Sequence, residues 1–305
     1  MDDSGIGERI AAMRHARGWT QADLAEATGF SPSTIAKIEQ GGQVWMSTYQ
    51  RVADVLGAQI AFVPSGSALA DTMPVKQRRQ ALRSPASLGE AFCGRLVQIA
   101  LDLPDLDRAV EVADLAVQAN TDLLEVGDPL IKRFGMEAVR RIRAAHPTIP
   151  LVAELSSSDW ADEQVRLAAD AGADIVMLLG LRQAMRIERA VSAARACGVG
   201  IVVGLPPEQE AGKWCRAAHG HGVDAISVIR NIDASSTVAD SFRQVRAVRR
   251  ATNLPVAVSG GFTPDQVADA ISLPWNVVIV GRAVVEAPSP GRVVEKLVQT
   301  VHGRG

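Results

Sequence analysis

The chain has 305 residues, 47% of them hydrophobic and 22% charged, a composition typical of a globular protein with more than one core. Its formal net charge of −2 excludes a whole-molecule field that would attract nucleic acid or a membrane, so any such partner must be recognised by a local site. Three widely spaced cysteines argue against a disulfide framework.

The acidic N-terminus is followed by no apolar run, and no stretch has the length of a membrane span. We therefore expect no signal peptide, no membrane partner and a cytoplasmic location.

The N-terminal part of the chain has the pattern of short, capped helices. Thr20 and Asp23 form a variant of the capping box at the start of one helix, which ends at Gly29. Ser31 and Pro32 suit the N-cap and first position of the next helix. Two short helices joined by a tight turn that contains a glycine predict a helix-turn-helix.

This stretch resembles the Cro/C1-type family of DNA-binding domains over about sixty residues. The matching residues are Thr20, Gln21, Leu24, Ala25, Gly29, Ser31, Ile35, Glu39 and Gly41. The resemblance implies that the second helix enters a DNA groove and that a dimer reads a palindromic double-stranded DNA operator. It implies DNA contacts by Gln21, Ser31, Pro32, Ser33, Thr34 and Lys37.

The charge of this region is unusual for a DNA-binding domain. Residues 1–65 hold five Lys or Arg against seven Asp or Glu, which leaves −2. Because phosphate neutralisation supplies most non-specific affinity, we expect weak DNA binding by this domain alone, with help from dimerisation or a basic flank. A helix-turn-helix kept only for protein contacts is the alternative.

The next stretch has the composition of a linker. Residues 65–74 are rich in turn formers and show no sustained periodicity. Residues 76–83 then hold four positive charges in eight residues and are suited to lie along phosphates beside the helix-turn-helix. A solvated basic helix or coil that joins two domains is an equal alternative.

From Arg95 onward, apolar runs of strand length alternate with amphipathic helical segments. The expected strands are 96–101, 122–126, 151–155, 175–179, 200–203, 225–228, 255–258 and 277–280, and the expected helices include 106–118, 136–145, 161–171, 187–196, 242–251 and 264–271. Eight alternations predict a closed (β/α)8 barrel rather than an open sheet. We thus expect an α/β protein, a TIM barrel at 94–305 preceded by a small all-α helix-turn-helix domain at 1–64 and a linker with a basic stretch at 65–93.

In this fold the chemistry lies at the C-terminal ends of the strands. The seventh strand is followed by Gly260 and Gly261, and the eighth by Gly281 and Arg282. Paired glycines let backbone N–H groups approach a phosphate while an arginine supplies charge, so these four residues predict a phosphate site. Glycines that serve tight turns beside a solvated arginine are the alternative.

The strand ends resemble the 3-hexulose-6-phosphate synthase branch of the orotidine 5′-monophosphate decarboxylase superfamily over residues 95–286. The motifs that carry the resemblance are Ala100-Leu-Asp-Leu103, Glu125-Val-Gly-Asp-Pro-Leu-Ile-Lys132, Val258-Ser-Gly-Gly261 and Val280-Gly-Arg282. The resemblance implies an obligate homodimer with sites at the interface and phosphorylated sugar ligands. It also implies Mg²⁺ bound by carboxylates that end strands two and three, here Glu125 and Glu154.

The sequence departs from the family pattern at two strands. The family signature Asp-x-Lys-x-x-Asp is replaced by Glu154-Leu-Ser156-Ser-Ser-Asp159, so a serine stands where the family has a lysine. A serine hydroxyl cannot supply a cation beside a developing carbanion. At strand six, the position of the family's catalytic histidine is Ile229. The changes predict a binding site that has lost its chemistry.

Arg230 follows Ile229 and adds positive charge at the same mouth. We expect it to hold an acidic or second phosphorylated group of the ligand, and pairing with Asp233 or solvent is the alternative. The residues expected to contact ligand, or to be vestiges of catalysis, are Asp102, Glu125, Lys132, Glu154, Ser156, Asp159 and Arg230. Mg²⁺ is the one cofactor indicated.

These observations favour a ligand-responsive transcription regulator, in which a catalytically degraded barrel binds a sugar phosphate or related phosphometabolite and shifts operator affinity. One alternative is an active phosphosugar lyase or isomerase that uses Asp102, Lys132 and Asp159, with the DNA-binding domain giving self-regulation. Lys132 is the nearby lysine that would substitute for the missing one. A scaffold with neither ligand nor activity is a third possibility.

Overall fold

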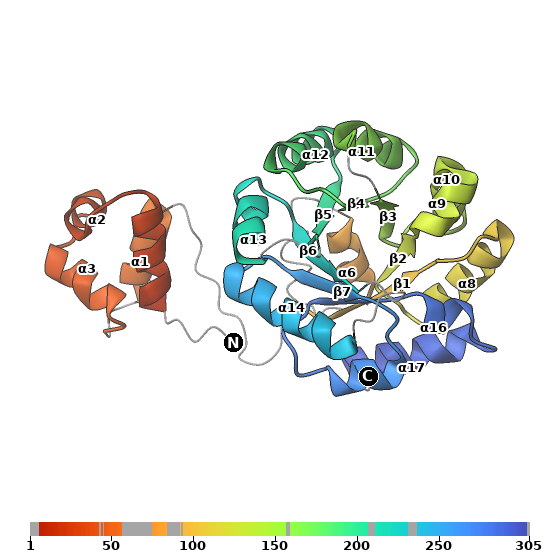
Figure 1. Cartoon of the computed structure of the whole chain (residues 1–305). Helices are drawn as coiled ribbons and strands as arrows, with labels where there is room; N and C mark the ends of the chain where they lie inside the picture. Colours follow the sequence, from red (N-terminus) through yellow and green to blue (C-terminus); the bar gives the residue numbers. More distant parts are fainter. Residues whose placement is uncertain are drawn as a thin grey trace. The chain divides into compact units, whose positions relative to one another are not determined.

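The computed structural model of the chain describes residues 6–42, 44, 46–56, 75–83, 92, 94–156, 159–206, 211–230 and 237–303. The chain divides into two compact units, Met1–Val63 and Pro64–Gly305. Figure 1 shows helices alone in the first unit and a barrel of strands surrounded by helices in the second. None of the described helices is long and apolar enough to cross a membrane.

The first unit contains the helices α1 (Ile6–Ala16), α2 (Gln21–Thr28), α3 (Pro32–Glu39) and α4 (Met46–Val55). The expected caps of α2 and α3 are confirmed. Thr20 Oγ1 accepts a hydrogen bond from the Asp23 N–H, and the Asp23 carboxylate accepts one from the Thr20 N–H. The Ser31 hydroxyl accepts the Thr34 N–H at the start of α3. Gly29, in the left-handed conformation with φ 71°, ends α2.

A small apolar core and a shielded ion pair hold these helices together. The core residues are Ile10, Leu24, Ala25, Ile35, Ile38, Val52 and Leu56. Arg14 on α1 donates to Glu39 on α3 over 2.6 Å, and each side chain is only 7% exposed. Gln21 also donates to Glu39, over 2.8 Å. The pair therefore fixes the end of α3 against α1 and engages Gln21, a residue expected to face DNA.

The second unit is a closed parallel barrel with the strand order β1-β2-β3-β4-β5-β6-β7-β8, which confirms the predicted fold. The strands are β1 (Leu96–Ala100), β2 (Leu123–Val126), β3 (Leu151–Ser156), β4 (Ile175–Leu179), β5 (Gly200–Gly204), β6 (Ala225–Ile229), β7 (Val256–Ser259) and β8 (Val277–Val280). Pairing of β1 with both β2 and β8 closes the barrel. The predicted bounds of β4 and β8 are correct, those of β7 differ by one residue at both ends, and those of the other strands differ by one residue at one end.

The described helices of this unit are α6 (Val75–Leu82), α8 (Leu106–Gln118), α9 (Asp128–Phe134), α10 (Met136–Ala145), α11 (Ala161–Asp170), α12 (Ala184–Cys197), α13 (Ala211–Gly220), α14 (Val238–Ala251), α15 (Pro264–Asp269), α16 (Arg282–Val285) and α17 (Pro290–His302). The predicted bounds of α8 and α10 are correct. The short helices α9 and α16 begin directly after β2 and β8, so they place residues at the mouth of the barrel.

The helix α6 packs at the N-terminal end of the barrel. Leu82 at its end is buried with Phe92 in the inner core, against residues that begin strands, such as Leu96 and Leu123. Arg79 donates to the carbonyl of Thr121 over 2.6 Å, just before β2. This docked helix differs from both expectations for the basic stretch, a phosphate-binding flank and a solvated connection. Residues 65–74, expected to be a linker, lie outside the described residues.

Candidate ligand site at the mouth of the barrel

Three carboxylates meet at the C-terminal ends of the first three strands. Asp102 follows β1, Glu125 lies in β2 and Glu154 lies in β3. Each offers an oxygen atom, and these atoms all lie within 4.8 Å of one another. Because β1, β2 and β3 are adjacent and parallel, residues distant in sequence converge at one mouth. These three residues are called the carboxylate cluster below.

The backbone around Asp102 is shaped to admit its carboxylate. A Cβ atom added at Gly127, after β2, would collide with Asp102 Oδ1, and one added at Gly281, after β8, would collide with Asp102 Oδ2. Gly127 and Gly281 are therefore needed where they stand. Gly281, predicted for phosphate binding, makes room for a carboxylate as well.

Hydrogen bonds from neighbouring residues orient two members of the carboxylate cluster, Glu125 and Glu154. The Gln98 amide of β1 donates a short hydrogen bond to Glu125 Oε2, and both side chains are buried. The Asp128 N–H donates to Glu154 Oε2 over 3.2 Å. Asp128 in turn pairs with Lys132 over 2.5 Å, within the first turns of α9. Gln98 and Asp128 were not anticipated from the sequence.

Burial and mutual repulsion raise the pKa values of all three carboxyl groups. The pKa of Glu154 is raised to about 7, mainly by burial and then by the charge of Asp102. The pKa of Asp102 is raised to about 6 by desolvation and by the charge of Asp128, against the opposing charge of Arg282. Burial first, and then Glu154, raises the pKa of Glu125 well above its usual value. Near neutral pH the cluster therefore favours taking up either protons or a cation.

The donor set fits a hard divalent cation. Mg²⁺ prefers carboxylate oxygens, and a bound cation would relieve the repulsion that raises these pKa values. Glu125 and Glu154 were the two metal ligands expected from the sequence. Asp102 is a third candidate, which the fold brings to the same point.

The glycine loop after β7 and the start of α16 line a cavity of about 470 Å³. Its lining residues are Arg230, Gly261, Thr263, Arg282, Ala283, Glu286 and Ala287. Gly260 and Gly261 have φ values of 131° and 71°, a region that favours glycine. The structure thus gathers Gly261, Arg282 and Arg230, three of the residues expected to bind phosphate groups, around one hollow.

Arg230 is held against the glycine loop. Its Nε donates to the carbonyl of Gly260 over 2.7 Å, and a Cβ atom at Gly260 would collide with the Arg230 side chain. Asp233, the alternative partner, lies outside the described residues. The close approach of Arg230 is therefore a second reason for glycine at position 260.

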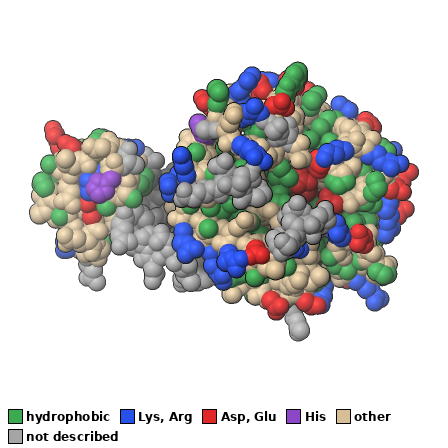
Figure 2. All heavy atoms as spheres, in the orientation of Figure 1, with side chains coloured by type: hydrophobic (Ala, Val, Ile, Leu, Met, Phe, Trp, Pro, Cys, Tyr) green, Lys and Arg blue, Asp and Glu red, His purple; other side chains and the backbone are tan. Residues whose placement is uncertain are grey.

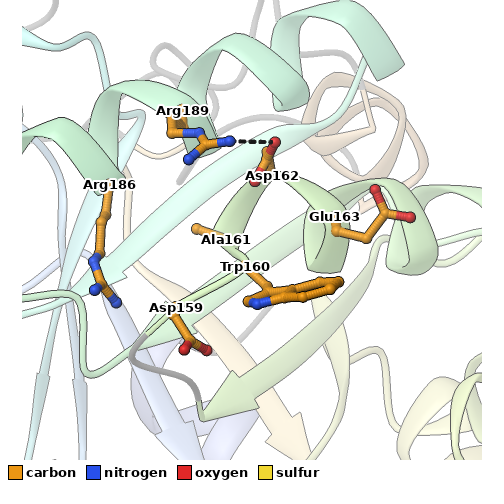
Figure 3. A pocket seen from close by; sticks show the side chains of 7 residues that line it. All are labelled: Asp159, Trp160, Ala161, Asp162, Glu163, Arg186 and Arg189. Atoms are coloured by element: carbon orange, nitrogen blue, oxygen red, sulfur yellow. Dashed lines mark ion pairs between the residues drawn. The ribbon is translucent and has the colours of Figure 1, made fainter.

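Asp159 does not join the carboxylate cluster. It lines a separate cavity of about 440 Å³ with Trp160, Ala161, Asp162, Glu163, Arg186 and Arg189, at the start of α11 and along α12. In Figure 3, Asp159 and Arg186 lie toward one end of this cavity, and Arg189 pairs with Asp162 at the other. Of the expected set of Asp102, Lys132 and Asp159, Asp102 belongs to the carboxylate cluster, Lys132 pairs with Asp128, and Asp159 lines this other cavity. Ser156 is exposed at the end of β3, and its N–H donates to Asp128 over 3.4 Å.

Apart from Gln21, which begins α2 and donates to Glu39, the residues expected to contact DNA lie at the start of α3 and on its outer side. The Ser31 hydroxyl lies 2.8 Å from that of Ser33 and 2.9 Å from that of Thr34. Pro32, Ser33 and Lys37 are exposed. These side chains are accessible to a partner.

The architecture defines a two-domain protein, a helix-turn-helix domain followed by a (β/α)8 barrel with an acidic cluster and a glycine-arginine hollow at its mouth. Residues 95–297 match the model of the orotidine 5'-phosphate decarboxylase / HUMPS family, and residues 6–61 match that of a helix-turn-helix domain. The chain belongs to the orotidine 5'-phosphate decarboxylase / HUMPS family.

Known relatives share the barrel. The chain is 30% identical over 197 residues to 3-hexulose-6-phosphate synthase 2 of Staphylococcus saprophyticus, across 64% of this chain and 91% of that protein. It is 28% identical over 208 residues to the bifunctional enzyme Fae/Hps of Methanoregula boonei, across 68% of this chain and 52% of that protein. The chain thus spans about half the length of the bifunctional relatives that it matches.

A crystal structure of 3-hexulose-6-phosphate synthase from Salmonella typhimurium superimposes with a TM-score of 0.63 at 29% identity, covering 68% of this chain and 98% of that one. The comparison adds a solved barrel to the evidence for the fold.

Proposed function

We propose that this chain is a DNA-binding transcription regulator whose barrel binds a sugar phosphate or related phosphometabolite and has lost most of its catalytic power. The observation that carries the proposal is the side chain at position 156. The family's lysine there is replaced by serine, while the carboxylates at the end of β1, β2 and β3 and the glycine-arginine hollow are kept.

Lys132, the lysine near the carboxylate cluster, is poorly placed to replace the family's lysine at position 156. Lys132 is near enough to lower the pKa of Glu154, but its amine is paired with Asp128 and its side chain is 68% exposed. An exposed and paired ammonium gives little stabilisation to a carbanion formed on a buried ligand atom. Binding without turnover is the outcome that we infer.

The mouth offers complementary contacts to the two ends of a phosphosugar. Phosphate oxygens would accept from backbone N–H groups of the glycine loop and from Arg282, with Arg230 available to a further acidic group. The sugar end would face the carboxylate cluster. Glu125 and Glu154, with Asp102, would hold Mg²⁺, which when bound neutralises the cluster and takes sugar oxygen atoms as ligands.

The helix α6 is the first described helix that follows the DNA-binding unit in the chain, and it packs at the N-terminal end of the barrel. Gln98 contacts Glu125 at the mouth, and it also lines, with Phe92, a small enclosed space along the barrel axis. Phe92 and Leu82 close the other end of the barrel. A ligand shifts operator affinity only if it binds one of two conformations of the protein more tightly than the other. We propose that the residues packed along the barrel axis, from Gln98 to Phe92 and Leu82, differ between these two conformations.

A homodimer would present two helix-turn-helix domains to a palindromic operator. Large apolar side chains on one side of the barrel support self-association: Trp160, Leu167 and Met185, at the start of α11, on α11 and on α12, are 73%, 47% and 67% exposed. Sedimentation velocity that finds only monomer at all concentrations would remove this part of the proposal.

An active phosphosugar lyase or isomerase is the second candidate. The three raised pKa values favour it, because a carboxyl group that titrates near neutral pH is suited to proton transfer. A turnover assay with 3-hexulose 6-phosphate in the presence of Mg²⁺ separates the two functions. We expect no steady turnover by the full chain, although the compound binds. Turnover that Lys132→Ala abolishes, and that the exposed control Lys296→Ala leaves intact, would establish the enzyme instead.

A further inference from the structure

Six cationic side chains gather on the two helices α13 and α14, which pack side by side on the outside of the barrel. They are Lys213 and Arg216 on α13, and Arg243, Arg246, Arg249 and Arg250 on α14. The only carboxylate within the two helices is Asp240. Figure 2 shows Lys and Arg side chains gathered over the part of the barrel where Figure 1 places α13 and α14. This set is called the basic face below.

Four members of the basic face are not neutralised. Arg243 pairs with Asp240, and Arg249 donates to the carbonyl of Leu254 over 2.9 Å. Lys213, Arg216, Arg246 and Arg250 are exposed and make no ion pair within the described parts of the chain. Spacings of three and four residues place the two members on each helix along the same side.

Arginines on three other barrel helices, in contrast, form ion pairs. Arg108 on α8 pairs with Glu111, Arg140 on α10 with Glu137, and Arg166 on α11 with Glu163. Each of these three surface cations therefore has a carboxylate one turn away that offsets its charge. Among the described residues, the basic face is therefore a concentration of positive charge with one paired carboxylate, in a chain whose net charge is −2.

The chemistry of this face fits a polyanion without an apolar component. Among the described residues, the large exposed hydrophobic side chains are Ile6, Met13, Trp160, Leu167 and Met185, and none of these lies on α13 or α14. A membrane surface is usually bound by cationic and apolar side chains together, so a lipid bilayer is disfavoured. A nucleic-acid backbone needs only cations at intervals along an accessible surface.

We propose that the basic face binds the phosphate backbone of DNA and supplies the non-specific affinity that the helix-turn-helix unit lacks. This inference rests on the DNA binding in the proposed function. Residues 1–65 hold five cationic against seven acidic side chains. The unit that would read the DNA sequence therefore has a net negative charge, which phosphate groups repel.

The test compares two variants of the full chain that carry the same net charge. In the face variant, Lys213, Arg216, Arg246 and Arg250 are changed to Gln. In the control variant, the paired residues Arg108, Arg140, Arg141 and Arg166 are changed to Gln. Binding of a fluorescein-labelled 40-base-pair duplex of arbitrary sequence is followed by anisotropy from about 20 to 300 mM salt, and circular dichroism checks that each variant is folded.

Each phosphate contact contributes about 0.9 to the slope of log K against log salt concentration. We expect the face variant to lose about 2 to 4 from the slope of the wild-type chain, and at least about tenfold in affinity at 50 mM salt, while the control variant keeps the wild-type slope. Equal slopes for the two variants would overturn the inference and leave the proposed function standing. A wild-type chain that binds no duplex at about 20 mM salt would overturn both.

Discussion

At the scale of single residues, the carboxylate cluster determines how the mouth of the barrel titrates with pH. Three acidic groups within 4.8 Å of one another are unfavourable when all are charged, and their pKa values rise accordingly. The neutral forms are favoured in the folded state, so protonation of the cluster stabilises the protein relative to the unfolded chain. That contribution is present at low pH and is lost as pH rises through the folded pKa values of about 6 and about 7.

Mg²⁺ should therefore stabilise the protein in a pH-dependent way. At pH 5.5 protons occupy the cluster and compete with the metal, whereas at pH 8 the carboxylates are free to bind it. We expect millimolar Mg²⁺ to raise the melting temperature by a few degrees at pH 8 and by much less at pH 5.5. Thermal unfolding of wild type and Glu154→Gln, with and without Mg²⁺, measures this. An equal effect of Mg²⁺ at both pH values, or an undiminished effect in Glu154→Gln, would contradict the cluster as the metal site.

Some residues of the mouth could be predicted from the sequence, and others depend on the fold. Glu125 and Glu154 were anticipated because they close apolar strand runs. Gln98 was missed because it lies inside β1 opposite Leu123, and only the folded barrel shows its hydrogen bond to Glu125 on the next strand. Asp159 lies beside Trp160 in a cavity lining that the sequence pattern did not indicate, and Trp160 has φ 52°, a left-handed conformation uncommon for such a residue.

At the scale of elements, the ion pair of Arg14 and Glu39 joins α1 to α3. Removing one partner of a shielded pair leaves an uncompensated charge, which costs more than the pair contributes. We expect Glu39→Gln to lower the free energy of unfolding of the helix-turn-helix unit by about 2 kcal/mol or more. Hydrogen exchange of the amides in α1 and α3 measures it. Glu26→Gln, at an exposed position, is the control. An equal and small change in the free energy of unfolding for both variants would show that the ion pair does not stabilise the unit.

The docking of α6 gives a second prediction at this scale. Leu82 is 1% exposed in the inner core, so its truncation leaves a cavity that the barrel cannot easily fill. Leu82→Ala should destabilise the barrel by about 2 to 5 kcal/mol, while Gln80→Ala, at an exposed position on the same helix, should change it by less than about 0.5 kcal/mol. Urea unfolding measures both. A neutral Leu82→Ala would show that α6 is not part of the barrel's core.

Elements were predictable where periodicity was strong. The barrel strands and the long helices α8 and α10 follow from regular alternation of apolar and polar residues. The short helices α9 and α16 were missed because four to seven residues are too few to show a helical period. The place of α6 was missed for a different reason: four positive charges indicate a solvated surface, whereas Leu82 and the hydrogen bonds of Arg79 hold the helix to the barrel.

At the scale of the whole molecule, charge is distributed unevenly between the two units. The unit suited to read sequence carries net negative charge, and the barrel carries both the ligand mouth and the basic face. Division of base reading and phosphate binding between the units would make operator affinity depend on the state of the barrel. A ligand that changes that state then changes DNA binding by linkage.

The most direct measurement is the affinity of the full chain for its operator, selected from random DNA, with and without 3-hexulose 6-phosphate and Mg²⁺. We predict that the phosphosugar changes the dissociation constant by at least about fivefold in either direction. Arg282→Ala should abolish this change while it leaves the affinity without ligand intact, and the exposed Arg292→Ala should behave as wild type. An operator affinity that no barrel-bound sugar phosphate alters, with binding shown by calorimetry, would contradict the regulator.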